Sequence, residues 1–339
     1  EMGRTAAAQR VFTTAAARNP HIAALRAADP EPPKRTWTAD ELLDATFREP
    51  RWTVPGILPA GLCFLGGRPK QGKSWMALQM AMAVGSGGRT LDQDVTKSRV
   101  LYLALEDGPR RLQSRLLKQR TQRGALVDFH TDWKPLTHEG TADLITAIDR
   151  HGYGFVIIDT LSRALGRADQ MDLTDMNLVI GSLQRIAVDR DVTILLVDHH
   201  RKGADASADG NVIDDMMGST GKTGVADAVL GIYRVRGQRD AVLKMTGRDV
   251  EEQEFAIRFD AELGCWQMLG NAGEVIKGSR QRQVLDAIKT LGAPTNNEAA
   301  EVIGIDRSNC FRVIQELLAQ GKIKDVPNTK PKRFMLTDE

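Results

Sequence analysis

Two glycines, a lysine and a serine stand at the spacing of a phosphate-binding loop. The segment reads Gly67-Arg68-Pro69-Lys70-Gln71-Gly72-Lys73-Ser74, followed by Trp75, and lies between an apolar run and an amphipathic run. In such a P-loop, glycines let backbone N–H groups turn toward phosphate, the lysine reaches the β and γ phosphates, and the serine hydroxyl holds Mg²⁺. We therefore expect residues 67–75 to bind ATP, with Lys73 in a catalytic role and Ser74 as a metal ligand.

Carboxylates end two other apolar runs. Residues 155–159 read Phe-Val-Ile-Ile-Asp, and we predict that Asp159 is the Walker B ligand of Mg²⁺. No Glu follows Asp159, so the base that activates the attacking water must come from elsewhere. Residues 100–105 lead into Glu106 and Asp107, of which we favour Glu106 as that base. The alternative is that both acids only cap the helix that follows, where negative charge is favourable.

The elements that must position these residues follow from the alternation of short apolar runs with amphipathic segments. This alternation predicts an α/β fold with a mainly parallel sheet flanked by helices, and continuously apolar runs suit strands buried on both faces. After a loop at residues 201–223, shorter runs predict an antiparallel extension of the sheet. The expected parallel strands are 62–66, 100–105, 155–159 and 193–198, the helices 74–84, 109–123, 141–151 and 175–189, and the later strands 228–234, 241–246, 254–259 and 265–269.

The P-loop, the Glu after a second strand and the Walker B Asp without a following Glu resemble RecA-like ATPases of the RepA and DnaB-type hexameric helicase branch. The resemblance assigns His199 as the residue that senses the γ-phosphate, although a histidine at this place can also be structural. It further assigns Arg248 as an arginine finger for the neighbouring subunit, with Lys244 as its companion. Three residues separate this pair where the family has one, and an exposed ion pair at a strand end is the alternative reading.

The resemblance covers residues 37–270 and implies a homo-oligomeric, hexameric ring with ATP and Mg²⁺ between subunits. Loops after Asp159 and His199 would line a channel for single-stranded DNA, and a primase or an initiator would be a partner during replication of a phage, plasmid or mobile element. Candidate phosphate contacts are Arg163 and Arg167 in the first loop and Arg201 and Lys202 in the second. Four acids in the second loop weaken the electrostatic case.

Two other classes of protein share the P-loop. A regulatory or loader ATPase would hydrolyse ATP without unwinding DNA. A small-molecule kinase would be expected to carry an Arg-rich lid and would need neither a finger in trans nor an additional domain.

The sequence divides the chain into three parts. Residues 1–36 are rich in Ala and Arg and predict a helix and a linker, residues 37–272 the ATPase core, and residues 273–339 a winged-helix domain. The last part contains expected helices at 280–291, 296–303 and 307–320 and strands at 322–326 and 333–336, an order typical of winged helix-turn-helix domains. That order does not distinguish DNA binding from protein contacts or a lid.

Composition limits the remaining possibilities. The chain has 46 basic and 44 acidic residues, so nucleic acid or membrane is not attracted by bulk charge and any DNA contact must be local. Cys63, Cys265 and Cys310 form no C-x-x-C, which argues against zinc and a disulfide framework. No apolar run has the length of a membrane span or a signal peptide, which predicts a cytoplasmic protein with no membrane partner. The Arg-rich, acid-poor start leaves a mitochondrial transit sequence as the alternative.

Overall fold

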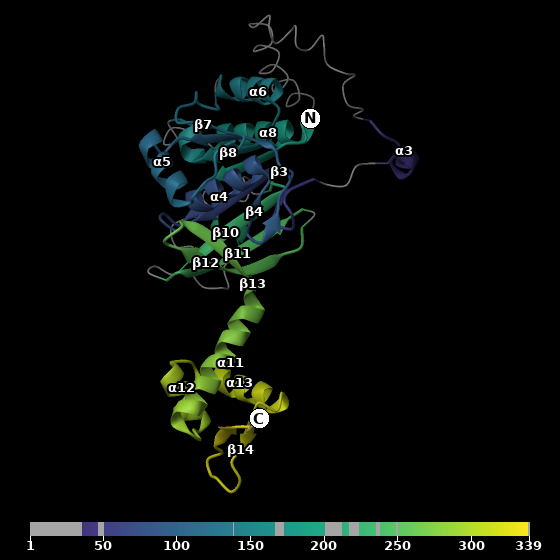
Figure 1. The fold of residues 1–339 in the computed structure, drawn as a ribbon. Helices are drawn as coiled ribbons and strands as arrows, with labels where there is room; N and C mark the ends of the chain where they lie inside the picture. The colour runs from purple at the N-terminus through teal and green to yellow at the C-terminus, as the bar shows by residue number, and fades with distance from the viewer. Residues whose placement is uncertain are drawn as a thin grey trace, which may run out of the picture.

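The computed structural model describes residues 36–46, 51–137, 139–166, 173–200, 212–216, 224–234, 238–248 and 250–337. Their main element is a nine-stranded sheet with the order β13-β12-β11-β10-β3-β9-β8-β6-β7 (Figure 1). The six strands from β10 to β7 in this order run parallel, and β11, β12 and β13 continue the sheet as antiparallel neighbours. The predicted fold class, a mainly parallel sheet with an antiparallel extension, is confirmed. The strands are β3 Gly61–Gly67, β6 Arg99–Ala104, β7 Val127–His130, β8 Tyr153–Asp159, β9 Thr193–Val197, β10 Ala228–Arg234, β11 Asp240–Gly247, β12 Gln253–Asp260 and β13 Cys265–Asn271.

Helices cover both faces of this sheet, and each face has its own apolar core (Figure 1). Successive side chains of a strand point to opposite faces. In β3, Cys63 and Leu65 therefore join one core and Leu62 and Phe64 the other, and all four are fully buried. This is why the strand has to be apolar throughout. The helices are α4 Lys73–Ser86 and α5 Pro109–Lys118 on the first face, and α6 Gly140–His151, α7 Leu161–Ala164 and α8 Leu173–Asp189 on the second.

Several short elements were not predicted. The edge strand β7 is only half-buried, and its apolar residues Val127 and Phe129 alternate with polar ones, a pattern too short to stand out in the sequence. The others are the helices α3 Ala39–Asp44 and α9 Val212–Asp215, and the two-stranded sheets β1 Trp52–Val54 with β2 Leu58–Pro59 and β4 Arg89–Thr90 with β5 Gln93–Asp94.

The last part of the chain forms a module with its own core. Its elements are α11 Ala272–Leu291, α12 Asn296–Ile303, α13 Arg307–Ala319, and the hairpin β14 Ile323–Asp325 with β15 Phe334–Leu336. The core of this C-terminal module contains only residues between 284 and 336. α11 begins at Ala272 rather than at the expected residue 280, because the Asn271 side chain caps it by accepting from the N–H groups of Gly273 and Glu274. This long helix leads directly from β13 into the module (Figure 1).

The remaining predictions about organisation are not tested by the fold. The N-terminal helix expected in residues 1–36 lies outside the described residues, apart from residue 36. None of the described helices combines the length and apolar composition that a bilayer crossing requires.

Candidate active site

The P-loop connects β3 to α4 and is shaped by glycine. Gly72 has φ = 98°, a left-handed conformation that favours glycine. A Cβ at this position would meet the indole ring of Trp266 at 2.9 Å, and Trp266 Nε1 donates a hydrogen bond to Gly72 O at 3.1 Å. Trp266 lies on β13, so a strand of the antiparallel extension packs against the P-loop at Gly72.

The Gln71 side chain forms two hydrogen bonds that stabilise the same loop. Its Oε1 accepts a hydrogen bond from Arg68 N at 2.7 Å, and its Nε2 donates to Arg234 O at 2.9 Å. Arg68, Pro69 and Lys70 are exposed. The loop is thus tied to the end of β10 while its outer residues stay accessible to a ligand.

Lys73 is the buried cation of the site. Its Nζ donates to Gly67 O at 2.7 Å and to Arg68 O at 3.1 Å, and the residue is 6% exposed. Burial lowers the pKa of Lys73 to about 8, although the charges of Asp159, Asp198 and Glu106 oppose the shift. When a nucleotide binds, its phosphate oxygens would replace these two carbonyls as acceptors for the Lys73 ammonium.

Asp159 and Ser74 supply the oxygens suited to Mg²⁺. Tyr102 Oη donates to Asp159 Oδ2 at 2.7 Å, whereas the buried Oδ1 has no hydrogen-bond partner among the described residues. Burial raises the pKa of Asp159, and hydrogen bonds from Tyr102 and Ser74 oppose that rise. A divalent cation would stabilise the ionised form and satisfy the orphaned oxygen. A carboxylate and a hydroxyl are the hard ligands that Mg²⁺ takes beside substrate phosphates, so these residues fit the ion.

The two acids after β6 have different environments. Asp107 is buried and forms ion pairs with Arg111 Nη1 at 2.9 Å and with Arg115. Glu106 is exposed, and its Oε1 accepts a hydrogen bond from Thr160 Oγ1 at 2.9 Å. α5 has no side-chain cap, so the capping alternative is not observed for either acid. Of the two acids, Glu106 is therefore the one whose carboxylate is accessible to solvent, and its role as the base stays a prediction.

His199 follows β9, the strand between β3 and β8 in the sheet. Its Nδ1 lies 3.3 Å from Lys73 Nζ, and its backbone N–H donates to Asp198 Oδ1 at 2.8 Å. Burial lowers the pKa of His199, and the charge of Lys73 lowers it further. The neighbouring His200 is buried and stacks on Tyr233 with ring centroids 5.0 Å apart. Of the two histidines, His199 is therefore the one that lies beside Lys73 of the P-loop.

The predicted finger pair is split by the structure. Lys244 is 4% exposed, pairs with Glu254 Oε1 at 3.0 Å, and lies 5.2 Å from the Tyr233 ring centroid. A side chain buried in its own sheet cannot reach a neighbouring subunit, so this geometry argues against Lys244 as a companion finger. Arg248, in contrast, is exposed, and its Nη2 donates to Gly224 O at 2.9 Å.

Arg248 also lies at the edge of the sheet opposite its own P-loop. β11 is antiparallel to β10, so Gly247 pairs with Ala228, which in turn pairs with Cys63 near the start of β3. β3 continues for four residues beyond Cys63 and ends at the P-loop with Gly67, ~13 Å farther along the strand. Arg248 therefore cannot reach the nucleotide of its own subunit.

The structure describes only some of the remaining predicted site residues. Arg163 is exposed on α7, directly after β8, whereas Arg167, Arg201 and Lys202 lie outside the described residues. The Trp75 ring packs under the Arg115 guanidinium, at 5.1 Å, and against Phe259. Trp75 would therefore contribute to the phosphate cradle through its backbone N–H.

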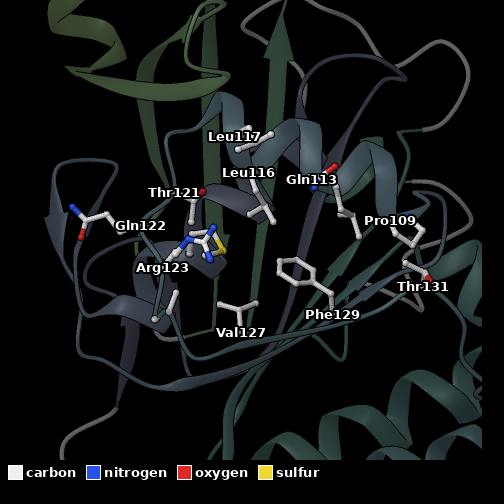
Figure 2. Close-up of a pocket in the computed structure, with 14 residues that line it drawn as sticks. Pro109, Gln113, Leu116, Leu117, Thr121, Gln122, Arg123, Val127, Phe129 and Thr131 are labelled. Atoms are coloured by element: carbon white, nitrogen blue, oxygen red, sulfur yellow. The ribbon is translucent and has the colours of Figure 1, made fainter.

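An apolar pocket of about 550 Å³ lies apart from this site (Figure 2). It is formed by α5, β7 and the segment between them, near the edge of the sheet farthest from β13. It contains none of the residues 67–75, Asp159 or His199, so we do not assign nucleotide to it. Its apolar side chains include Leu112. Leu116, Leu117, Val127 and Phe129 also line it (Figure 2).

Three supports of the site were not predicted from the sequence: Tyr102, Trp266 and the Gln71–Arg234 hydrogen bond. Tyr102 carries a weak signal, because a lone hydroxyl in an otherwise apolar buried run needs a polar partner. Trp266 and Arg234 carry none, since they are far from the P-loop in sequence.

The Lys73 environment predicts proton uptake when ATP binds at alkaline pH. With a pKa of about 8 in the free protein, Lys73 is mostly protonated at pH 7 and mostly neutral at pH 9. Phosphate favours the charged form, so binding should take up a proton above pH 8 and little from Lys73 at pH 7. Calorimetry in two buffers of different ionisation enthalpy measures this. Lys73→Arg should remove the alkaline uptake, because arginine stays charged, whereas Lys70→Arg should not. Equal uptake by wild type and Lys73→Arg would contradict the assignment.

No curated protein matches the chain. A solved structure described as the crystal structure of the RadB recombinase is 16% identical, with a TM-score of 0.45, over 63% of this chain and 91% of that chain. A family model described as an AAA domain matches residues 27–205, more than half of the chain, and this span includes the P-loop, Glu106, Asp159 and His199. The chain therefore belongs to the AAA domain family, and its site is that of a P-loop ATPase.

Proposed function

We propose that this protein is an ATP-driven DNA translocase or helicase that works as a ring, most simply a hexamer of the RepA and DnaB type. The observation that carries the proposal is the position of Arg248. The P-loop, Glu106 and Asp159 lie at one edge of the sheet, and the exposed arginine lies at the other. Each subunit thus presents a nucleotide edge and a cationic edge, and head-to-tail contacts between them close into a ring when the rotation permits.

Each residue of the shared site has a separate task in hydrolysis. Lys73 neutralises the β and γ phosphates, and Glu106 accepts a proton from the attacking water as general base. Ser74 and Asp159 would hold Mg²⁺, which supplies charge neutralisation between the phosphates when bound. Arg248 of a neighbouring subunit would stabilise charge that develops on the γ-phosphate, which makes hydrolysis depend on assembly.

Two connections lead from the nucleotide toward the segments proposed to contact DNA. On one side His199, beside Lys73, is separated from residues 201–211 only by His200. On the other side Glu106 bonds Thr160, and Thr160 Oγ1 lies 3.0 Å from Ser162 Oγ at the start of α7, the helix that carries Arg163. DNA bound by these segments would therefore affect both His199, the proposed γ-phosphate contact, and Glu106, the proposed general base.

The test is DNA-dependent hydrolysis. Single-stranded DNA should stimulate ATPase activity, a forked duplex should be unwound, and a non-hydrolysable ATP analogue should produce a ring in native mass spectrometry. Lys73→Ala is the inactive control. The proposal would be contradicted if single-stranded DNA does not change the ATPase activity and the protein forms no ring. That result would favour the alternative, a regulatory or loader ATPase whose C-terminal module binds DNA or a protein.

A further inference from the structure

The C-terminal module has two helices in the arrangement that helix-turn-helix proteins use to enter a DNA groove. α12 ends at Ile303, and α13 begins at Arg307 after the turn Gly304-Ile305-Asp306. Gly304 has φ = 73°, and the Asp306 side chain caps α13 by accepting from the N–H groups of Ser308 and Asn309. A short turn with glycine, followed by a capped second helix, is the geometry of this motif.

α13 has one buried face and one exposed face. Cys310, Val313, Ile314 and Leu317 are buried in the module core. The exposed face carries groups able to contact base edges and phosphates in the first turns of the helix, the part that usually reads bases. Its members are Arg307, Ser308, Phe311, Arg312 and Gln315, with Phe311 50% exposed.

Basic residues outnumber acidic ones on α13 and the β14–β15 hairpin, since residues 307–336 contain seven Lys/Arg and two Asp/Glu. Four acidic side chains have partners inside the module: Asp306 caps α13, Glu298 pairs with Arg333, Glu316 with Lys277 and Asp325 with Lys332. Within the described part of the chain, Arg307, Lys322 and Lys330 form no ion pair. Lys322 directly follows the end of α13, and Lys330 lies in the loop of the β14–β15 hairpin. Local positive charge therefore gathers on α13 and the hairpin, although the whole chain is almost neutral.

We infer that α13 and the β14–β15 hairpin form a binding surface for double-stranded DNA. The exposed face of α13 would enter the major groove, which at about 12 Å admits one α-helix, while Lys322 and Lys330 contact the phosphate backbone. Phe311 has a place in such a groove, where apolar side chains contact thymine methyl groups. The surface goes beyond the proposed function, because the translocase needs single-stranded DNA at its core and the module needs neither ATP nor a ring.

α11 explains how both activities can reside in one chain. Its twenty residues span ~30 Å, and Val284 and Ile288 of its second half belong to the module core. The module core has no residue of the nine-stranded sheet. The helix thus holds a duplex-binding module beside an ATPase core (Figure 1).

The experiment measures duplex binding by the full chain without nucleotide, from the anisotropy of a labelled duplex. The double variant Arg307→Ala/Arg312→Ala should bind at least ~10-fold more weakly. The matched control Arg282→Ala/Lys289→Ala removes the same charge from exposed positions of α11 and should stay within about two-fold of wild type. All four side chains are exposed, and unchanged thermal melting confirms folding. Lys322→Ala/Lys330→Ala should weaken binding to all sequences alike and reduce the slope of log affinity against log salt by about 2.

Three results would overturn the inference: no duplex binding by wild type, wild-type affinity in the Arg307/Arg312 variant, or an equal loss in the α11 control. The first two would leave α13 as a protein-contact surface. The failure of the proposed function is separate, because it would show as ATPase activity that single-stranded DNA does not stimulate. The Arg307/Arg312 variant should keep that stimulation, and its loss together with intact duplex binding would also count against the inference.

Discussion

Replacement of Arg248 by alanine should abolish ATP hydrolysis and leave ATP binding intact. An arginine finger contributes ~10³–10⁵-fold to the rate of phosphoryl transfer, so the remaining activity should be close to background. Binding should change by less than about two-fold, because Arg248 lies at the opposite edge of the sheet from its own P-loop. Steady-state ATPase assays and fluorescent-nucleotide titration measure the two quantities.

Mixing experiments decide whether the arginine acts in trans. In a mixed ring of Arg248→Ala and Glu106→Ala subunits, some interfaces combine an intact Glu106 with an intact Arg248 of the neighbour. Activity should therefore return on mixing two inactive proteins. Loss of nucleotide binding in Arg248→Ala alone would point to a role within the subunit. Lys244→Ala offers a contrast, since removing the buried partner of Glu254 should lower thermal stability before it affects catalysis.

Replacement of Glu106 by glutamine should reduce the turnover number by ~10²–10⁴-fold, the usual contribution of a general base. The amide can still accept the hydrogen bond from Thr160 Oγ1, so the local structure should persist. ATP affinity should be retained, because Glu106 acts on water rather than on the phosphates. Single-turnover assays separate the chemical step from binding and product release.

Asp107→Asn is the matched control, since it makes the same chemical change at the next residue. Asp107 is buried between Arg111 and Arg115, so this variant should lose stability through two weakened ion pairs. Its turnover number should exceed that of Glu106→Gln when both are measured below their melting temperatures. The reverse order would transfer the role of base to Asp107.

Much of the fold could be predicted because its strands and helices follow from local patterns of apolar and polar residues. A strand buried on both faces must be continuously apolar, and residues 193–198 and 228–234 accordingly appear as β9 and β10. Helix ends were less certain. α5 was expected to reach residue 123 and ends at Lys118, while the helix expected to begin at residue 280 begins at Ala272, after the Asn271 cap. A cap is a three-dimensional contact, and composition alone does not show it.

The sequence by itself determined where the candidate residues lie, at the P-loop and at the ends of three further strands. The carboxyl ends of parallel strands lie at the same end of a sheet, and Lys73, Glu106, Asp159 and His199 accordingly lie near one another. Only the tertiary structure showed that Glu106 and Arg248 are exposed, whereas Asp107 and Lys244 are buried in ion pairs. Asp107 and Lys244 are functional candidates in sequence, but burial beside Arg115 and Glu254 commits them to the fold. Burial and pairing depend on residues distant in sequence, so they appear only when the sheet has formed.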